Sequence, residues 1–108
     1  MLMQVSATNT NDRTVIAVSG EVDIATSPAL DSAVITAVGE GAKHITIDLT
    51  DVSFMDSSGL GVVVRGLKRS READIDLDLV ITNDRVLKVF AITGLDQVIE
   101  IHSALADI

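Results

Sequence analysis

The residues best suited to chemistry in this chain are two adjacent hydroxyls, Ser57 and Ser58, which follow Asp56 and precede Gly59 and Gly61. Alternating apolar residues before this segment predict a strand that enters it, and an amphipathic pattern after it predicts a helix. The hydroxyls would therefore lie at a helix N-terminus, where outward-pointing N–H groups favour negative charge. Each glycine costs about 1 kcal/mol relative to alanine in a helix interior. Helix stability therefore does not explain the two glycines.

Neither serine fits the pattern of a catalytic nucleophile. The nucleophile elbow of serine hydrolases has the pattern Gly-x-Ser-x-Gly. Ser57 does not fit, because Met55 takes the place of the first glycine. Ser58 does not fit either, because Asp56 and Leu60 take the places of both glycines. A general base would have to be His44 or His102, the only histidines, and the sequence shows no residue that would orient either one. A serine-dependent hydrolase, which needs a base within hydrogen-bond reach of Ser57, is therefore a disfavoured alternative.

The same segment does not match a nucleotide-binding or metal-binding motif. A dinucleotide fingerprint would place a third glycine at Val64, and no P-loop lysine follows Gly59 and Gly61. The three aspartates within residues 74–78 alternate with apolar residues, which predicts the solvated face of a strand, and the calcium-loop pattern is absent. We expect no metal site and no cofactor.

A hydroxyl at this helix start could accept a phosphate. Phosphoserine carries about −1.5 to −2 charges, which a helix N-terminus tolerates, so the modified protein would remain folded while a docked partner met bulk and repulsion. Bare backbone at Gly59 and Gly61 would let a partner approach closely, so we expect Gly59→Val to hinder docking more than folding. Alternatively, Asp56 and Ser57 merely cap the helix. The residues alone leave both possibilities open.

Composition and charge narrow the class of partner. The 108 residues predict one domain over residues 1–108, with a formal charge of −8 from 16 acidic and 8 basic residues. This balance argues against binding to nucleic acid or to an anionic membrane. There is no cysteine, and the N-terminus lacks the basic and long apolar regions of a signal peptide. No apolar run approaches the ~20 residues of a membrane span, so we expect a cytoplasmic protein.

Strand and helix patterns alternate along the chain. A short strand around Val5, a polar turn over residues 8–13 and a strand over residues 14–19 predict an N-terminal β-hairpin. The remaining strands are predicted over residues 44–49, 75–81 and 98–101, and helices over residues 28–38, 57–71, 84–93 and 103–108. The predicted class is α/β, with a mixed, mostly parallel central sheet of about five strands and four helices.

Local signals predict where several elements begin and end. We expect Gly20 to stop the second strand, and Ser27 to cap the first helix ahead of Pro28. Either Asn83 or Asp84 should cap the third helix. The second helix should bury a stripe with spacing i, i+3, i+4 and i+7, formed by Leu60, Val63, Val64 and Leu67.

Three segments together resemble a known family. Residues 54–61, Phe-Met-Asp-Ser-Ser-Gly-Leu-Gly, resemble the signature of bacterial anti-sigma factor antagonists, which are single-domain members of the STAS (sulphate transporter and anti-sigma antagonist) group. Residues 18–23 are similar to the family's strand ending in Gly-Glu-Leu-Asp, with Val22 in place of the commoner leucine. Residues 86–95 are similar to its closing helix, with Thr93 where serine is frequent. The resemblance spans the chain and implies a STAS-like fold.

The resemblance implies a partner switch controlled by phosphorylation. In the family, the unphosphorylated antagonist binds an anti-sigma factor that is also a serine kinase, and a sigma factor is released. The kinase then phosphorylates the serine after the motif's aspartate, which is Ser57 here, and a PP2C-type, metal-dependent phosphatase reverses the step. The protein itself would not be an enzyme. The partner-binding residues carried over from the family are Asp23, Asp56, Ser57, Ser58, Gly59 and Gly61, with Asp23 close by at the end of its strand.

Two other roles within the group use the same fold as a plain interaction module. Some members are components of stressosomes or scaffolds, and others are subunits of lipid-transport complexes. The intact Asp-Ser-Ser-Gly of residues 56–59 favours the switch, because a module without a phosphorylation cycle has no need of that serine.

Overall fold

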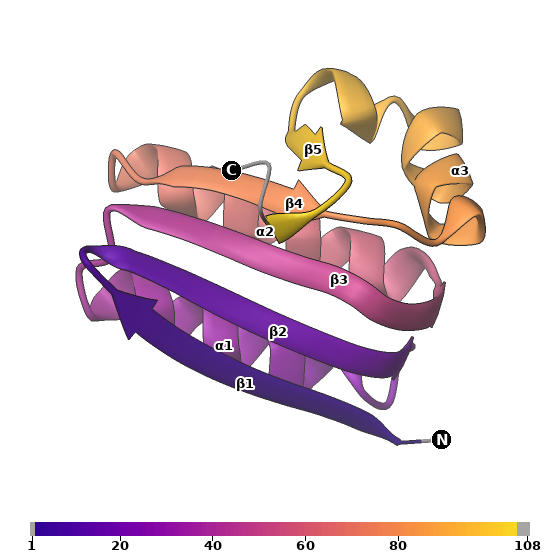
Figure 1. Cartoon of the computed structure of the whole chain (residues 1–108), viewed down its shortest axis with the longest axis horizontal. Coiled ribbons are helices and arrows are strands. Elements are labelled where there is room, and N and C mark those ends of the chain that lie inside the picture. The colour runs from indigo at the N-terminus through magenta and orange to yellow at the C-terminus, as the bar shows by residue number, and fades with distance from the viewer. Residues whose placement is uncertain (1, 106–108) are drawn as a thin grey trace.

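The computed structural model describes residues 2–105 and contains one five-stranded sheet in the order β1-β2-β3-β4-β5 (Figure 1). β1 is antiparallel to β2, and the other pairs are parallel. This confirms the predicted mixed, mostly parallel sheet and its N-terminal hairpin. The elements are β1 (Met3–Thr10), β2 (Arg13–Val22), α1 (Ser27–Gly39), β3 (His44–Met55), α2 (Ser57–Glu72), β4 (Asp76–Val80), α3 (Asp84–Thr93), a 3-10 turn (Leu95–Gln97) and β5 (Glu100–His102).

Helix number differs from the prediction. Residues 2–105 contain three α-helices, not four. The fourth was predicted over residues 103–108, of which 106–108 lie outside the described residues. The 3-10 turn at Leu95–Gln97 was not predicted, and it displaces β5 to Glu100–His102 from the predicted residues 98–101.

The two strands of the N-terminal hairpin, β1 and β2, are longer than the sequence predicted. The predicted turn over residues 8–13 shrinks to Asn11 and Asp12, whose φ angles of 49° and 70° are left-handed conformations that Asn and Asp tolerate. Gly20 was predicted to stop β2, and this is wrong, because the strand continues to Val22 through a register shift at Gly20. A φ of 97° and the Leu2 carbonyl oxygen, which would clash with an added Cβ, require glycine there.

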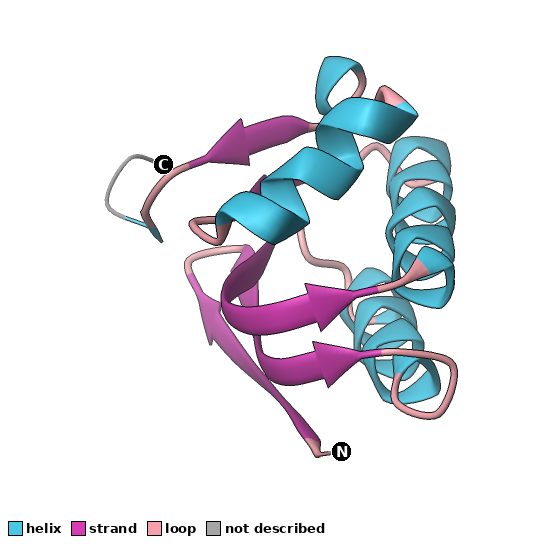
Figure 2. Ribbon diagram, turned by 90° about the vertical axis from the view of Figure 1, so that its right-hand side faces the viewer, coloured by secondary structure: helices cyan, strands magenta, loops and turns pink. Residues whose placement is uncertain are grey.

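Two helices, α1 and α2, cover one face of the sheet (Figure 2). Alternating side chains of the central strands form the core with these helices. The fully buried members with the largest side chains in these elements include Ile16, Leu30, Val34, Ile45, Ile47, Leu49, Val62 and Leu79. α1 begins at Ser27 with Thr26 as its N-cap, so the prediction of Ser27 as the cap is off by one residue.

The buried face of α2 is also rotated from the predicted stripe. Val62 is fully buried, whereas Val64, predicted to face inward, is exposed. The predicted stripe was based on hydrophobic residues alone, whereas the buried face of α2 also contains the small residues Gly59, Gly66 and Ser70. Gly66 allows α1 to approach α2 closely. If residue 66 had a Cβ, this atom would lie 3.2 Å from Cγ1 of Val34 in α1. The buried positions of α2 are Gly59, Val62, Val63, Gly66 and Ser70.

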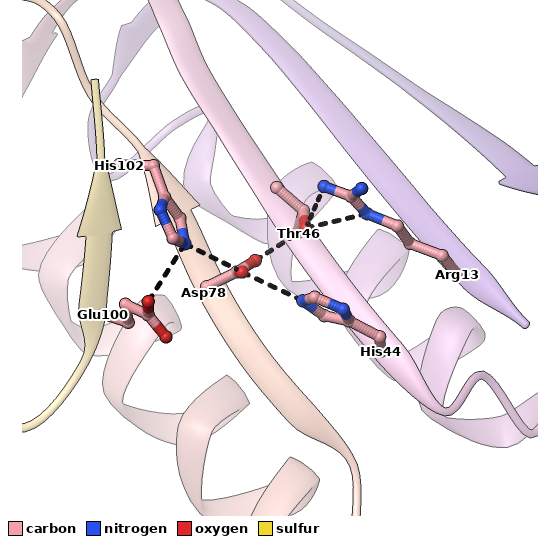
Figure 3. Close-up of polar contacts among 6 residues, drawn as sticks. All are labelled: Arg13, His44, Thr46, Asp78, Glu100 and His102. Atoms are coloured by element: carbon pink, nitrogen blue, oxygen red, sulfur yellow. Dashed lines mark hydrogen bonds and ion pairs between the residues drawn. The ribbon is translucent and has the colours of Figure 1, made fainter. Parts of the chain in front are cut away.

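A polar cluster lies on the opposite face of the sheet around Asp78, which is only 5% exposed (Figure 3). Its Oδ2 lies 2.9 Å from His44 Nε2 and 3.1 Å from His102 Nε2, and its Oδ1 accepts a 2.6 Å hydrogen bond from Thr46 Oγ1. The prediction that this aspartate is solvated is wrong, because these partners replace water around the buried carboxylate. The contact of His102 joins β5 to β4.

We expect Asp78→Ala to lower the free energy of unfolding by about 1.5–3 kcal/mol, because Thr46 and both histidines lose a charged acceptor. Urea denaturation measures this effect. Asp76→Ala is the control, since Asp76 is exposed on the same strand. Equal losses in the two variants would contradict a structural role for the Asp78 cluster.

Candidate functional site

The serine segment lies where the carboxyl ends of β2 and β3 meet. These strands run parallel, and Val22 pairs with Met55 at their last residues. The backbone N–H of Asp56 then donates to the Val22 carbonyl oxygen at 3.1 Å. The turn after β2 and the start of α2 are therefore neighbours at one edge of the sheet, with Asp23 and Asp56 each one residue beyond the paired ends.

Asp56 is the N-cap of α2. Its backbone is extended, and its Oδ1 accepts hydrogen bonds from the N–H groups of Ser58 at 2.8 Å and Gly59 at 3.4 Å. Two of the four N–H groups that a helix start leaves unpaired are satisfied in this way. Its carboxylate is therefore committed to holding the helix.

Ser57 is the first residue of α2, and its side chain is exposed, whereas Ser58 is half-buried. Capping is supplied by Asp56, and within residues 2–105 the Ser57 side chain makes no hydrogen bond or ion pair. The hydroxyl of Ser57 is thus accessible at the positive end of the helix dipole and has no structural task in this conformation.

The turn after β2 is held by hydrogen bonds around Asp23. Its Oδ1 accepts from the N–H groups of Ala25 and Thr26, each at 3.0 Å, and Thr26 Oγ1 donates to the Glu21 carbonyl oxygen at 2.8 Å. The hydrogen bond from the Thr26 N–H, with further ones from the Thr26 hydroxyl and the Ala25 N–H, lowers the pKa of the Asp23 carboxyl and outweighs the opposing effect of burial. Asp23 therefore stays ionised beside the serine segment at neutral pH.

The same turn exposes a large apolar side chain that sequence reasoning missed. Ile24 is 81% exposed on the backbone that Asp23 and Thr26 hold in place. The sequence did contain a signal for this exposed residue, because Ile24 directly follows Asp23 in the segment between the second predicted strand and the first predicted helix. A rigidly presented apolar residue of this kind suits contact with a partner protein.

A second apolar feature lies on the α3 side of the serine segment. Phe54, which is 48% exposed, lines an open groove of about 530 Å³ between the end of β3 and α3. Met55, Val86 and Val89 line the same groove, and Glu21 and Arg85 add charge. Ser57 is therefore close in sequence to apolar surface as well as to carboxylates.

The two glycines of α2 have different surroundings. Gly59 is buried, and an added Cβ would lie 2.6 Å from Met55 Cγ and 2.8 Å from Val22 Cγ1. The prediction that Gly59 leaves the helix start bare is wrong, because it allows α2 to pack against the ends of β2 and β3. An added Cβ at Gly61 would meet only Arg65 Nη1, at 3.1 Å, so the flexible end of one side chain, and no backbone or core atom, lies over Gly61.

Neither histidine is placed to activate Ser57. Both have Nε2 at hydrogen-bond distance from Asp78, on the face shown in Figure 3. His44 begins β3, and Ser57 follows the other end of that twelve-residue strand. Within residues 2–105 no group of three or more His, Cys, Asp or Glu side chains is arranged so that it could hold a metal ion. No helix in that part of the chain is long and apolar enough to cross a membrane.

Comparisons with known proteins agree on one family. The STAS domain model matches residues 4–108. The anti-sigma-B factor antagonist of Listeria monocytogenes is 44% identical over 89 residues, which are 82% of this chain and 77% of the relative. The crystal structure of an anti-sigma factor antagonist from Mycobacterium paratuberculosis matches with a TM-score of 0.91 at 25% identity, over 98% of this chain and 90% of that one.

The solved structures similar to this chain include one protein in two phosphorylation states. SpoIIAA, an anti-sigma factor antagonist, matches in its unphosphorylated form with a TM-score of 0.78 at 27% identity, over 94% of this chain and 89% of that one. Its phosphorylated form, described as a Bacillus cell fate determinant, matches with a TM-score of 0.71 at 26% identity, over 94% and 92%.

The contrast between the glycines predicts opposite effects of alanine. Gly59→Ala should lower the free energy of unfolding by about 1–3 kcal/mol through overpacking against Met55 and Val22. Gly61→Ala should leave it unchanged or raise it by up to about 1 kcal/mol, because alanine favours the helix. Urea denaturation of the two variants provides the matched comparison, and a loss at Gly61 as large as that at Gly59 would contradict this assignment.

The lowered pKa of Asp23 predicts a pH dependence. A depressed carboxyl pKa stabilises the fold above the unfolded-state value of 3.8, and this contribution is lost as the pH falls through that value towards the lower folded-state pKa. The difference in urea midpoint between the unsubstituted protein and Asp23→Asn should therefore be constant near neutral pH and shrink below pH 3.8. A difference that grows on acidification would contradict the ionised Asp23 turn.

Proposed function

We propose that this chain, which belongs to the STAS domain family, is an anti-sigma factor antagonist switched by phosphorylation of Ser57. The observation that carries the proposal is that capping and exposure fall to different residues at the start of α2. Asp56 caps the helix, so the exposed hydroxyl of Ser57 is available for modification. The antagonists from Listeria and Mycobacterium, and SpoIIAA with its two phosphorylation states, support this choice.

In the proposed cycle an anti-sigma factor that is also a serine kinase binds the unmodified chain. The kinase transfers the γ-phosphoryl group of ATP to Ser57 Oγ, the hydroxyl proton leaves, and ADP is the second product. A PP2C-type phosphatase then uses water to return the serine and release inorganic phosphate. The chain itself contributes the acceptor hydroxyl and the docking surface. It is a regulatory protein of the cytoplasm and not an enzyme.

The proposed docking surface consists of the two neighbouring turns at the carboxyl ends of β2 and β3. Asp23 and Ser57 provide its polar part, Ile24 and Phe54 are its exposed apolar side chains, and Gly61 leaves room above α2. Ser58 and the buried backbone of Gly59 support this surface from below, together with the capping carboxylate of Asp56.

Phosphorylation would change this surface more than the fold. The phosphate brings about −1.5 to −2 charges next to carboxylates that already make the site acidic, so a partner that tolerated the neutral hydroxyl meets added repulsion and bulk. The helix dipole and the N–H groups at the start of α2 offset this charge within the chain itself.

Incubation with the cognate kinase and ATP should add one phosphate to Ser57 and dissociate the complex. Intact-mass analysis and size-exclusion chromatography measure the two effects, with Ser58→Ala as the matched control that should still be modified. A Ser57→Ala complex that still dissociates on addition of ATP would contradict the assignment. Binding that is indifferent to ATP in the unsubstituted protein would favour a plain interaction module.

Ser57→Asp should weaken kinase binding at least tenfold while the thermal midpoint stays within about 2 °C of the unsubstituted protein, because surface substitutions usually change stability by no more than about 0.5 kcal/mol. Isothermal titration and a melting curve measure this pair of quantities. A large fall in the midpoint with unchanged binding would show that Ser57 is structural.

A further inference from the structure

One ridge of α2 connects the proposed acceptor to a positive charge. Ser57, Gly61 and Arg65 are spaced by four residues within the helix. Residues at this spacing are neighbours on a helix surface, with Cβ atoms about 5–6 Å apart, and helical side chains lean towards the N-terminus. The Arg65 side chain is therefore directed along the ridge towards Ser57.

The guanidinium of Arg65 already occupies the space above Gly61. Its Nη1 lies 3.1 Å from the point where a Cβ of Gly61 would be, which is one helical turn from Ser57. The Arg65 side chain is 54% exposed, so about half of its surface is accessible to solvent. The absent side chain of Gly61 provides the room that lets this arginine lie back along the helix.

The present ion partner of Arg65 holds it weakly. Arg65 Nε lies 3.9 Å from Asp31 Oδ1, near the limit of an ion pair, whereas Arg69 Nη1 donates to the same oxygen at 3.0 Å. Asp31 therefore keeps a good partner when Arg65 leaves. Asp31 is half-buried, but at this distance, and with the Arg65 side chain exposed, the pair contributes little to stability, so a stronger anion can capture Arg65 at small cost.

We propose that Arg65 binds the phosphate on Ser57 once that serine is modified, an inference that rests on the proposed function. A phosphoserine offers three acceptor oxygens and more negative charge than a carboxylate, and the planar guanidinium matches it with paired N–H donors. The phosphate is drawn along the ridge over Gly61. In the phosphorylated chain the phosphate and the Arg65 guanidinium would thereby be held together over Gly61, within the proposed docking surface.

The test places phosphoserine at position 57 during translation, so that no kinase is needed, and follows the phosphate by ³¹P NMR as a function of pH. A neighbouring cation favours the dianion and lowers the titration midpoint. We expect the midpoint of Arg65→Gln to be about half a pH unit higher than that of the otherwise unsubstituted phosphoprotein, a shift typical of an exposed ion pair.

Two further variants separate a direct contact from general electrostatics. Lys68→Gln removes the same charge from an exposed position further along α2 and should leave the midpoint unchanged. Gly61→Ala keeps both charges but places a Cβ beside the guanidinium, so its midpoint should rise part of the way. Amide NMR spectra of each variant verify the fold.

Equal midpoints in the unsubstituted protein and Arg65→Gln would overturn the proposal, as would equal shifts in Arg65→Gln and Lys68→Gln. Because the phosphate is introduced without a kinase, these outcomes are independent of whether a cellular kinase uses Ser57. Conversely, a kinase that ignores Ser57 would refute the proposed function and leave the contact between Arg65 and the phosphate measurable.

Discussion

The organisation of the site depends on how the start of α2 is fixed to the end of β2. The Asp56 N–H donates to the Val22 carbonyl oxygen, and the Asp56 carboxylate accepts from the next helical N–H groups. Asp56 thus lies between the end of β3 and the start of α2, caps the helix and joins it to the end of β2. Because Asp56 supplies the cap, the adjacent Ser57 can be exposed without loss of the cap.

The two sides of α2 have separate tasks. Gly59 and Gly66 let the inner side approach the strands and α1 at distances that a larger residue would prevent. The outer ridge of Ser57, Gly61 and Arg65 makes no comparable demand on packing, so it can serve a partner and a phosphate. A charge added to this ridge changes recognition, while the core beneath keeps its contacts.

Sequence patterns predicted the sheet, the three α-helices within residues 2–105 and the position of Ser57 at a helix start, because alternation, caps and helix-ending glycines act locally. These patterns failed where contacts with other elements determine the local conformation or the burial of a residue. Gly20 forms a bulge instead of a stop, and Asp78 is buried because His44 and His102 come from other strands. Likewise, the face of α2 that is buried depends on its glycines. The exposure of Ile24 depends on the hydrogen bonds that fix the turn after β2.

The central claim is that a phosphate on Ser57 decides whether the partner is bound. The most direct measurement is purification of the chain from its native cells, in the bound and the free fraction, followed by intact-mass analysis and peptide mapping of each. The free fraction should carry one phosphate on Ser57, and the chain bound to an anti-sigma factor kinase should carry none. Phosphate on Ser57 at equal occupancy in both fractions would contradict the switch.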